Sequence, residues 1–424
     1  MKLIEIQFQI ASALSRWGLI AGMRGSMIFS RFLLVVFISH YLDLAALGLF
    51  GLILGAVAMV PAFIALGMAH VVMRDAVTMS PAQLVDALRH YWAYTLTIYF
   101  LALSAASLAA YGAILSPIWI IVIALTLFEH LGSDFFLLLS NLERAMLAQF
   151  SAFLRSVAWI VVYLPLALYF PALRTLGTLL LFWLIGSAAS VVVFAVATRS
   201  WPWRDACKTP LRPMWIRSLA RSSVVLYIND LSFVASQYMD RYLVTLYLGL
   251  ELTGVYILYW STANAIYTFV SMTVLQHQRP LLIKAHHHGR AAQRKQHISL
   301  ARTTALSAAS IGLVVAVAFV FLVPLLRQPL ANANLASFWL IVVGMVVRCI
   351  ADWGAMALFA ARRDRIMTAT NLAAITALAL FQAALLPVIG LAGAGTALLI
   401  TFGIVAYWRY RLVFTMRWIN HGAN

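Results

Sequence analysis

Several ionisable side chains lie inside long apolar stretches of this sequence, and they are the residues with which it could do chemistry. A charge at the centre of a lipid bilayer costs about 2.5–3.5 kcal/mol on insertion scales, so such residues normally face protein or water. In the first apolar stretch Arg24 and Arg31 are seven residues apart, about two helical turns, and therefore project from one face. No acid lies three or four residues from Arg31, so its partner is expected on another helix or on a ligand.

Two polar stripes follow in the middle of the chain. The first returns every three or four residues and indicates a helix face that lines a pore. It contains Asn229, Asp230, Ser232, Ser236, Gln237, Asp240 and Arg241. The second stripe places Trp260, Asn264 and Tyr267 at i, i+4 and i+7, which combines aromatic rings with hydrogen-bonding groups. Ordinary helix packing explains the second stripe as well as a substrate-binding face does.

Buried carboxylates offer a different kind of chemistry, because such a group can be charged in one conformational state and neutral in another. Glu129, Asp134 and Asp230 are the candidates for coupling a conformational change to an ion. Arg348 and Asp352 are four residues apart, and we expect them to form an internal salt bridge that lets their helix enter the membrane.

The composition indicates an integral membrane protein. Of the 424 residues 64% are hydrophobic and 10% are charged, and the mean hydropathy is +0.93. The net charge of +17 comes from basic residues between apolar runs, which favours an anionic lipid surface as partner and argues against nucleic acid. Two cysteines and the absence of metal-ligand or catalytic motifs predict no cofactor, no metal and no enzyme. The first 17 residues do not resemble a signal peptide, so we expect the N-terminus to be retained.

Cutting the sequence at its polar breaks predicts twelve membrane-spanning helices of roughly 20 residues each. Their approximate cores are residues 18–40, 47–69, 91–114, 117–139, 150–170, 176–197, 222–246, 252–275, 303–326, 336–360, 366–387 and 390–408. Alternate breaks and the two termini hold 23 of the 30 Lys and Arg residues. The positive-inside rule therefore places both termini in the cytoplasm.

The spans divide into an N-terminal lobe (1–200) and a C-terminal lobe (222–424), joined by a basic linker (201–221). The tryptophans of the linker suit the headgroup level of a membrane, with Arg and Lys beside them for anionic lipid. A weak duplication supports the division, because YLDL at 41–44 and GLF at 48–50 reappear as YLGL at 247–250 and GVY at 254–256. Each predicted half has an even number of spans, so the copies are parallel repeats.

The chain resembles the polysaccharide-flippase (Wzx-type) branch of the multidrug/oligosaccharidyl-lipid/polysaccharide (MOP) exporter superfamily. The resemblance rests on the six-plus-six topology and on short patterns: residues 24–26 (RGS), 47–51 (LGLFG), 66–68 (LGM) with Arg74, 240–243 (DRYL), 248–249 (LG), 254–256 (GVY) and Pro280. It implies two six-helix lobes in a V shape, as in the MATE transporters, which expose a central cavity alternately to each side of a bacterial cytoplasmic (inner) membrane.

The cargo implied by this resemblance is an undecaprenyl-diphosphate-linked oligosaccharide for O-antigen or exopolysaccharide synthesis, with coupling to protons or sodium and with a polymerase and assembly proteins as further partners. Arginines could then bind the diphosphate, and polar or aromatic side chains could bind sugars. The first set is Arg24, Arg31 and Arg241, and the second is Asn229, Gln237, Trp260, Asn264 and Tyr267.

Three alternatives remain open. A multidrug exporter of the same fold would need a cavity rich in unpaired acids, whereas the first span contributes two arginines. A membrane-embedded glycosyltransferase or polymerase would need longer ordered loops than the chain offers. A scaffold protein would not need a line of buried polar groups.

Overall fold

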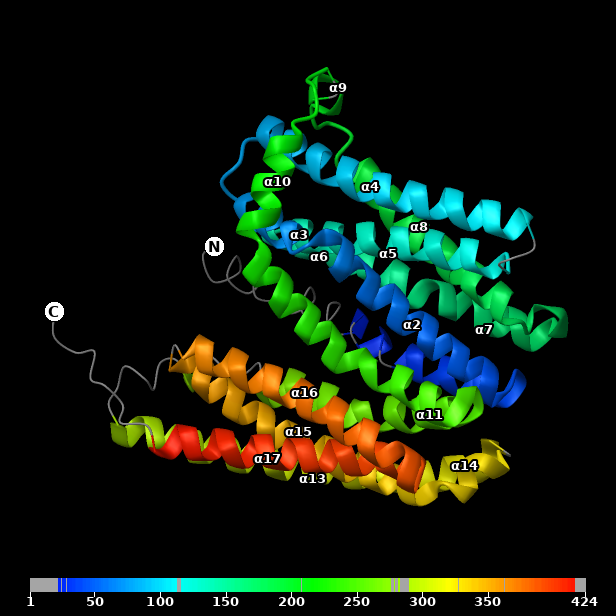
Figure 1. The fold of residues 1–424 in the computed structure, drawn as a ribbon, viewed down its shortest axis with the longest axis vertical. Helices are drawn as coiled ribbons and strands as arrows, with labels where there is room; N and C mark the ends of the chain where they lie inside the picture. Colours follow the sequence, from blue (N-terminus) through cyan, green and yellow to red (C-terminus); the bar gives the residue numbers. More distant parts are fainter. Residues whose placement is uncertain are drawn as a thin grey trace, which may run out of the picture. The chain divides into compact units, whose positions relative to one another are not determined.

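A computed structural model shows a helical protein. It describes residues 22–415 apart from residues 24, 28, 113–115, 207, 276–277, 279–280, 283–289, 327 and 362. Every regular element in this part of the chain is a helix (Figure 1).

Ten of the described helices are long and apolar enough to cross a membrane. They are α2 (Leu44–Ala65), α4 (Pro81–Tyr111), α5 (Ile118–Asn141), the continuous α6 (Ala145–Phe153), η1 (Leu154–Ala158) and α7 (Trp159–Tyr169), α8 (Leu176–Ala197), α11 (Val224–Val270) with η3 (Ser271–Leu275), α13 (Arg290–Leu326), α15 (Leu335–Ala360), α16 (Asp364–Ile389) and α17 (Leu391–Thr415). The chain is a multi-pass membrane protein.

These ten helices differ from the expected twelve at two places. A shorter apolar helix, Gly25–Tyr41, lies at the first predicted span. The predicted seventh and eighth spans are continuous as α11 and η3, which together have 52 residues. Gly249 interrupts this helix with a positive φ of 81° and a ψ of 177°, a conformation that glycine adopts without steric cost. A straight helix of that length would be about two and a half times as long as the hydrocarbon core is thick, so the break at Gly249 marks a change of direction.

The described chain forms two compact units. Unit 1 comprises the residues up to Phe37 and Ile53–Val234, and unit 2 comprises Ile38–Leu52 and the residues from Ala235 onward. In unit 1, α5 packs against α4, α6 and α8 (Figure 1). In unit 2, α15 packs against α13, α16 and α17.

Local sequence signals explain where the helices of unit 1 begin. Ser80 caps α4: its hydroxyl accepts from the backbone N–H of Gln83, and the Gln83 side chain accepts from the backbone N–H of Ser80. Pro81 occupies the first helical position, where its missing N–H has no cost. Thr175 caps α8 in the same way through the backbone N–H of Thr178.

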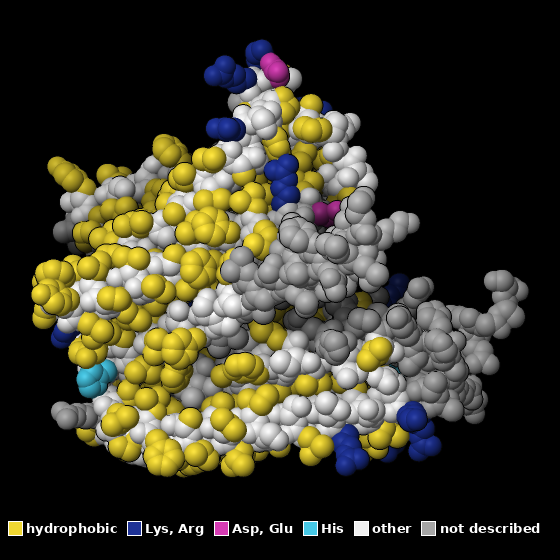
Figure 2. All heavy atoms as spheres, turned by 180° about the vertical axis from the view of Figure 1, so that it is seen from behind, with side chains coloured by type: hydrophobic (Ala, Val, Ile, Leu, Met, Phe, Trp, Pro, Cys, Tyr) yellow, Lys and Arg dark blue, Asp and Glu magenta, His cyan; other side chains and the backbone are white. Residues whose placement is uncertain are grey.

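Large apolar side chains remain on the outside of the helices. Figure 2 shows one face on which hydrophobic side chains cover much of the surface, whereas Lys and Arg are few. The exposed residues of α4, α8 and α13 include Phe100, Leu108, Ile185, Val192 and Phe321. Such a surface is unfavourable in water and suits contact with acyl chains.

The duplicated segments meet inside unit 2. A Cβ atom at Gly48 would overlap the carbonyl oxygen of Leu250, and a Cβ atom at Gly254 would overlap that of Leu44. Leu44 and Leu250 are equivalent positions in the two copies, as are Gly48 and Gly254. The glycine of each copy therefore lies against the leucine carbonyl of the other copy, as in a two-fold symmetric contact. The two helix starts pack against each other through the same residues.

Replacing Gly254 with alanine is expected to destabilise unit 2, because the new methyl group meets backbone rather than a movable side chain. Overpacking of this kind costs about 1–3 kcal/mol. The measurement is thermal unfolding of the purified protein. Gly403→Ala in α17 is the control, since no atom lies within 4 Å of the place that its new methyl group would take. Equal stability of Gly254→Ala and wild type would contradict the close packing of the two copies.

Candidate functional site

Asp134 lies in the interior of unit 1 among neutral hydrogen-bond donors. Its side chain is on α5, and the residue is 4% exposed. Oδ2 accepts from the indole N–H of Trp92 at 3.2 Å and Oδ1 from the hydroxyl of Tyr91 at 3.4 Å. His130, one turn earlier on α5, contacts the hydroxyls of Tyr91 (2.9 Å) and Tyr99 (3.3 Å), and its Nε2 lies 3.9 Å from Asp134. Within the described chain no Lys or Arg forms an ion pair with Asp134.

Glu129, on the same helix, has a different environment. Its Oε2 accepts from Nη1 of Arg155 at 3.0 Å, and its Oε1 accepts from Trp183 (2.9 Å) and Ser187 (2.6 Å). Arg155 lies in the π-helical turn η1, which interrupts the fifth predicted span. An ion pair with this many hydrogen bonds holds three helices together and leaves no free carboxylate oxygen.

Asp230, at the start of α11, forms an ion pair with His70 of the short helix α3 (Met68–Asp75), at 2.6 Å between Oδ2 and Nε2. The hydrogen bond to Asp230 raises the pKa of His70 above its ordinary value, against the opposing effect of burial. The starts of the two helices are tied together, because the hydroxyl of Ser223, just before α11, donates to the carbonyl oxygen of Leu66, just before α3. The pair therefore helps to hold the first turns of α11 in unit 1.

Exchanging His70 for glutamine is expected to lower thermal stability at pH 6 more than at pH 9. A histidine with a raised pKa contributes stability that is complete below about pH 6.5 and is lost as the pH rises through the raised pKa. The measurement is the difference in melting temperature between variant and wild type at both pH values. His40→Gln is the control, because no described carboxylate pairs with that exposed histidine. A larger difference at pH 9 would refute the ion pair.

The predicted second stripe forms a line of rings and cations in unit 2. The guanidinium of Arg241 lies over the Trp260 ring at 4.8 Å, and that of Arg348 lies over the Tyr267 ring at 4.6 Å. Asn264, between the two rings along the helix, has a buried Oδ1 without a hydrogen-bond partner in the described chain. We call these five residues the arginine–aromatic line. Tyr267 follows Trp260 by seven residues, so the two cations are roughly 10 Å apart along the helix.

The two arginines of this line differ in their partners. Arg241 is 1% exposed, lies over the ring of Tyr238 as well, and has Asp240 at 3.7 Å and the carbonyl of Gly51 at 3.4 Å. Arg348 is 5% exposed and contacts a second ring, Phe402 at 5.2 Å. No ion pair or hydrogen bond to a described residue involves its guanidinium, and its Nε is buried. Arg348 is thus a cation that aromatic rings stabilise without a carboxylate.

The prediction of a salt bridge between Arg348 and Asp352 is wrong. Asp352 pairs instead with Arg409 of α17, at 3.4 Å between Oδ1 and Nη1. Arg409 also donates to Thr370 and Asn371 of α16 and to the carbonyl of Ala351, so it joins three helices. Residues four apart can pair, but a residue on a neighbouring helix competes when the packing directs it to the same carboxylate.

The remaining predicted binding residues are spread over both units. Arg31 is exposed on the helix Gly25–Tyr41, and within the described chain no carboxylate pairs with it. Asn229 is exposed at the start of α11, and Gln237 is half-buried, with its carbonyl accepting weakly from Arg241. Arg24 lies outside the described residues. The roles of these residues in binding stay predictions.

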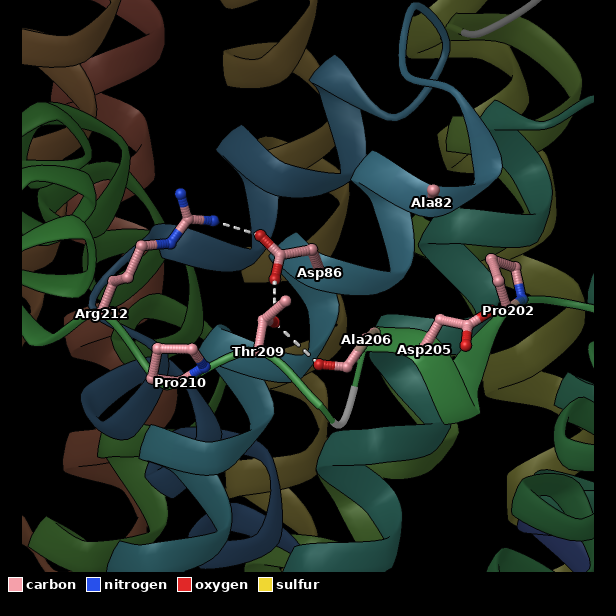
Figure 3. A pocket seen from close by; sticks show the side chains of 8 residues that line it. All are labelled: Ala82, Asp86, Pro202, Asp205, Ala206, Thr209, Pro210 and Arg212. Atoms are coloured by element: carbon pink, nitrogen blue, oxygen red, sulfur yellow. Dashed lines mark hydrogen bonds and ion pairs between the residues drawn. The ribbon is translucent and has the colours of Figure 1, made fainter.

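The linker packs against unit 1. The ring centroids of Trp203 and Trp92 are stacked 5.9 Å apart, and those of Trp215 and His90 are 5.3 Å apart, so the linker tryptophans have partners in unit 1. Arg89 donates to the carbonyl oxygens of Ala206, Thr209 and Pro210, and Arg212 pairs with Asp86. Figure 3 shows a pocket of about 410 Å³ beside the Arg212–Asp86 pair. Its lining residues are Ala82, Asp86, Pro202, Asp205, Ala206, Thr209, Pro210 and Arg212.

Sequence reasoning missed several partners of the site residues. Arg155 lies inside a predicted span, and the preceding predicted span contains Glu129. These two opposite charges within apolar stretches could have indicated the pair. Arg409 lies one residue beyond the core predicted for the last span, a position that is typical of an arginine at the membrane interface. No residue near His70 in the sequence indicates that His70 pairs with Asp230. Among the described residues no group of three or more His, Cys, Asp or Glu side chains could hold a metal ion.

No protein-family model matches this sequence, and no curated protein sequence matches it. Solved structures do match. An inward-facing multidrug resistance MATE family transporter of the MOP superfamily aligns over 94% of this chain and 96% of its own, with a TM-score of 0.70 and 12% identity. An outward-facing conformation of such a transporter aligns over 92% and 93%, with a TM-score of 0.57 and 12% identity.

A MOP superfamily transporter from Pyrococcus furiosus aligns over 93% of this chain and 95% of its own, with a TM-score of 0.54 and 11% identity. Its binding pocket is described as having a reversed polarity that suggests a different function. Identities this low establish similarity of fold. The chain therefore has the all-helical fold of MATE transporters of the MOP superfamily, which is the fold class that its sequence predicts.

Proposed function

We propose that this protein is a transporter that moves an undecaprenyl-diphosphate-linked oligosaccharide across the bacterial cytoplasmic membrane by alternating access. The observation that carries the proposal is Arg31. An arginine exposed in the middle of an apolar helix, without a carboxylate partner among the described residues, is unfavourable against acyl chains. It is favourable where water and an anionic group reach it, and a diphosphate offers several oxygens for charge-assisted hydrogen bonds.

The arginine–aromatic line supports an anionic, sugar-bearing cargo. Its cations and rings are the side chains that bind phosphate and stack on sugar faces, and Arg348 adds a positive charge that no described carboxylate neutralises. The buried positions of Arg241 and Arg348 mean that a substrate would reach them only in another conformation. Arg31, which is already exposed, is the residue for the first contact.

Asp134 is the carboxylate that we propose for ion coupling. Glu129 is neutralised by Arg155 and Asp230 by His70, whereas Asp134 contacts neutral donors and His130. A buried carboxylate without a fixed cation can gain a proton or a sodium ion in one conformation and lose it in the other. The neighbouring tyrosines supply donors that reorient between the two states.

The test is a deletion strain. Loss of this gene is expected to remove a surface polysaccharide and to leave lipid-linked oligosaccharide accessible only from the cytoplasmic side of the membrane. If the protein were a polymerase, single repeat units would still reach the outer side. Wild-type polysaccharide and no accumulated lipid intermediate would overturn the proposal.

A multidrug exporter is the second candidate, because Asp134 in unit 1 is an acid without a fixed cation and could bind a cationic drug. The same deletion strain discriminates between the two functions. Greater sensitivity to lipophilic cations, with normal polysaccharide, would favour this candidate. Polysaccharide loss without a change in drug sensitivity supports lipid-linked oligosaccharide transport.

A further inference from the structure

Helix α10 (Pro213–Ser222) of the linker has two faces with different surroundings. On the inner face Trp215, Ile216, Leu219 and Ala220 pack against the apolar cluster that α3, α4 and α5 build in unit 1. Residues three and four apart share a helix face, so this packing fixes which side chains point outward. The outer face therefore belongs to Met214, Arg217 and Arg221.

The outer face combines an apolar side chain with two free cations. Met214 is 75% exposed, and Arg217 and Arg221 are exposed as well. In the described part of the chain no ion pair involves either arginine. Two other basic residues of the linker do have carboxylate partners. Arg212 pairs with Asp86, and Lys208 pairs with Asp205 at 2.8 Å. Arg217 and Arg221 thus keep their full charge on a helix whose orientation is set by the protein.

The position of α10 along the chain puts this face at a membrane boundary. Helix α11 begins at Val224, two residues after α10 ends, and continues as an apolar helix long enough to span a bilayer (Figure 1). Val225, one turn after Arg221, is 78% exposed. Arg221 and Arg217 are then one and two turns from the apolar region, the depth at which phosphate headgroups begin.

We propose that Arg217 and Arg221 bind the phosphate of an anionic phospholipid, whose acyl chains lie beside the exposed Val225 at the start of α11. The two arginines are four residues apart, about 6 Å along the helix, so both guanidinium groups reach one headgroup. Guanidinium groups bind phosphate oxygens in a bidentate manner. An amphipathic helix with basic side chains and an exposed apolar residue is the form in which proteins bind the surface of anionic membranes.

Lipid bound at this face would stabilise unit 1. The inner face of α10 contacts α3, and α3 holds the first turns of α11 through His70 and Asp230. A ligand that binds the folded form alone raises its melting temperature by mass action. This proposal does not depend on the transported substrate, because resident phospholipid and cargo are different molecules.

The experiment compares variants of the full-length protein purified in neutral detergent. Phosphatidylglycerol or phosphatidylcholine is titrated into the micelles, and the melting temperature is recorded. Wild type is expected to gain stability with phosphatidylglycerol at lower concentrations than with phosphatidylcholine. In Arg217→Gln/Arg221→Gln the half-saturating concentration of phosphatidylglycerol should rise at least about tenfold, because each basic residue near an anionic surface contributes a factor of about five. Without lipid this variant should melt like wild type, since both side chains are exposed.

Arg204→Gln/Lys208→Gln removes the same number of positive charges from the same linker and is the matched control. Its half-saturating concentration should stay within about twofold of wild type. Three outcomes would overturn the proposal: an equal rise in the control, an unchanged value in Arg217→Gln/Arg221→Gln, or equal stabilisation by phosphatidylcholine. The same stabilisation by inorganic phosphate would also overturn it, because the site would then bind a free anion.

Discussion

Arg31→Ala is expected to abolish surface polysaccharide while the amount of protein in the membrane stays normal. Arg31 is exposed, so its removal leaves no cavity and no unpaired buried group. A hydrogen bond to a charged group contributes about 1.5–3 kcal/mol, which corresponds to a loss of about 10- to 150-fold in affinity for a diphosphate. The measurement is the export of polysaccharide by a deletion strain that carries the variant gene, with immunoblotting of the membrane fraction.

Two further variants test whether the loss of export depends on the guanidinium group at position 31. Arg31→Lys keeps the charge but loses the bidentate geometry, and we expect export between that of wild type and Arg31→Ala. Arg204→Ala removes an exposed arginine of the linker and should leave export unchanged. Full export by Arg31→Ala would exclude this side chain from the substrate path.

Removing one partner of the Asp352–Arg409 pair should destabilise unit 2 by about 3 kcal/mol. Arg409 is 1% exposed and interacts with two side chains of α16 besides Asp352, so its loss removes three contacts and leaves the partly buried Asp352 carboxylate without its cation. The readout is the melting temperature and the yield of the purified protein. We expect Arg409→Met and Asp352→Leu each to melt well below wild type.

The double variant Arg409→Met/Asp352→Leu should recover part of the loss, because it leaves neither charge unpaired. Arg348→Met/Asp352→Leu should show no such recovery, since aromatic rings stabilise Arg348. The opposite result would favour a pair between Arg348 and Asp352, as their spacing suggests. In that result the melting temperature would recover in Arg348→Met/Asp352→Leu, whereas the two losses would simply add in Arg409→Met/Asp352→Leu.

The periodicity of the sequence predicted the helices and the faces that they present. Trp260, Asn264 and Tyr267 share a face because they are four and three residues apart, and the structure has them in line along α11. The repeat was equally visible, since Gly48 and Gly254 mark positions where two helix starts come too close for a side chain. Such features depend on residues near one another in sequence, where helical geometry alone determines the outcome.

Partners on other helices could not be predicted in this way. Asp352 has an arginine four residues away, yet it pairs with Arg409, which is 57 residues further along the chain. Nothing in the sequence near the linker indicates that Trp203 stacks on Trp92 of α4. Which of two possible partners a charge or a ring contacts depends on how helices pack, and one sequence contains no direct signal for that.

Transport in a purified system tests the central proposal most directly. The protein is reconstituted into vesicles that contain lipid-linked oligosaccharide in both leaflets, and a membrane-impermeant glycosidase is added outside. With wild-type protein nearly all of the oligosaccharide is expected to become accessible to the enzyme, whereas Arg31→Ala vesicles should stop at the outer-leaflet fraction. Digestion that stops at the outer-leaflet fraction with wild-type protein as well would contradict the proposed transport.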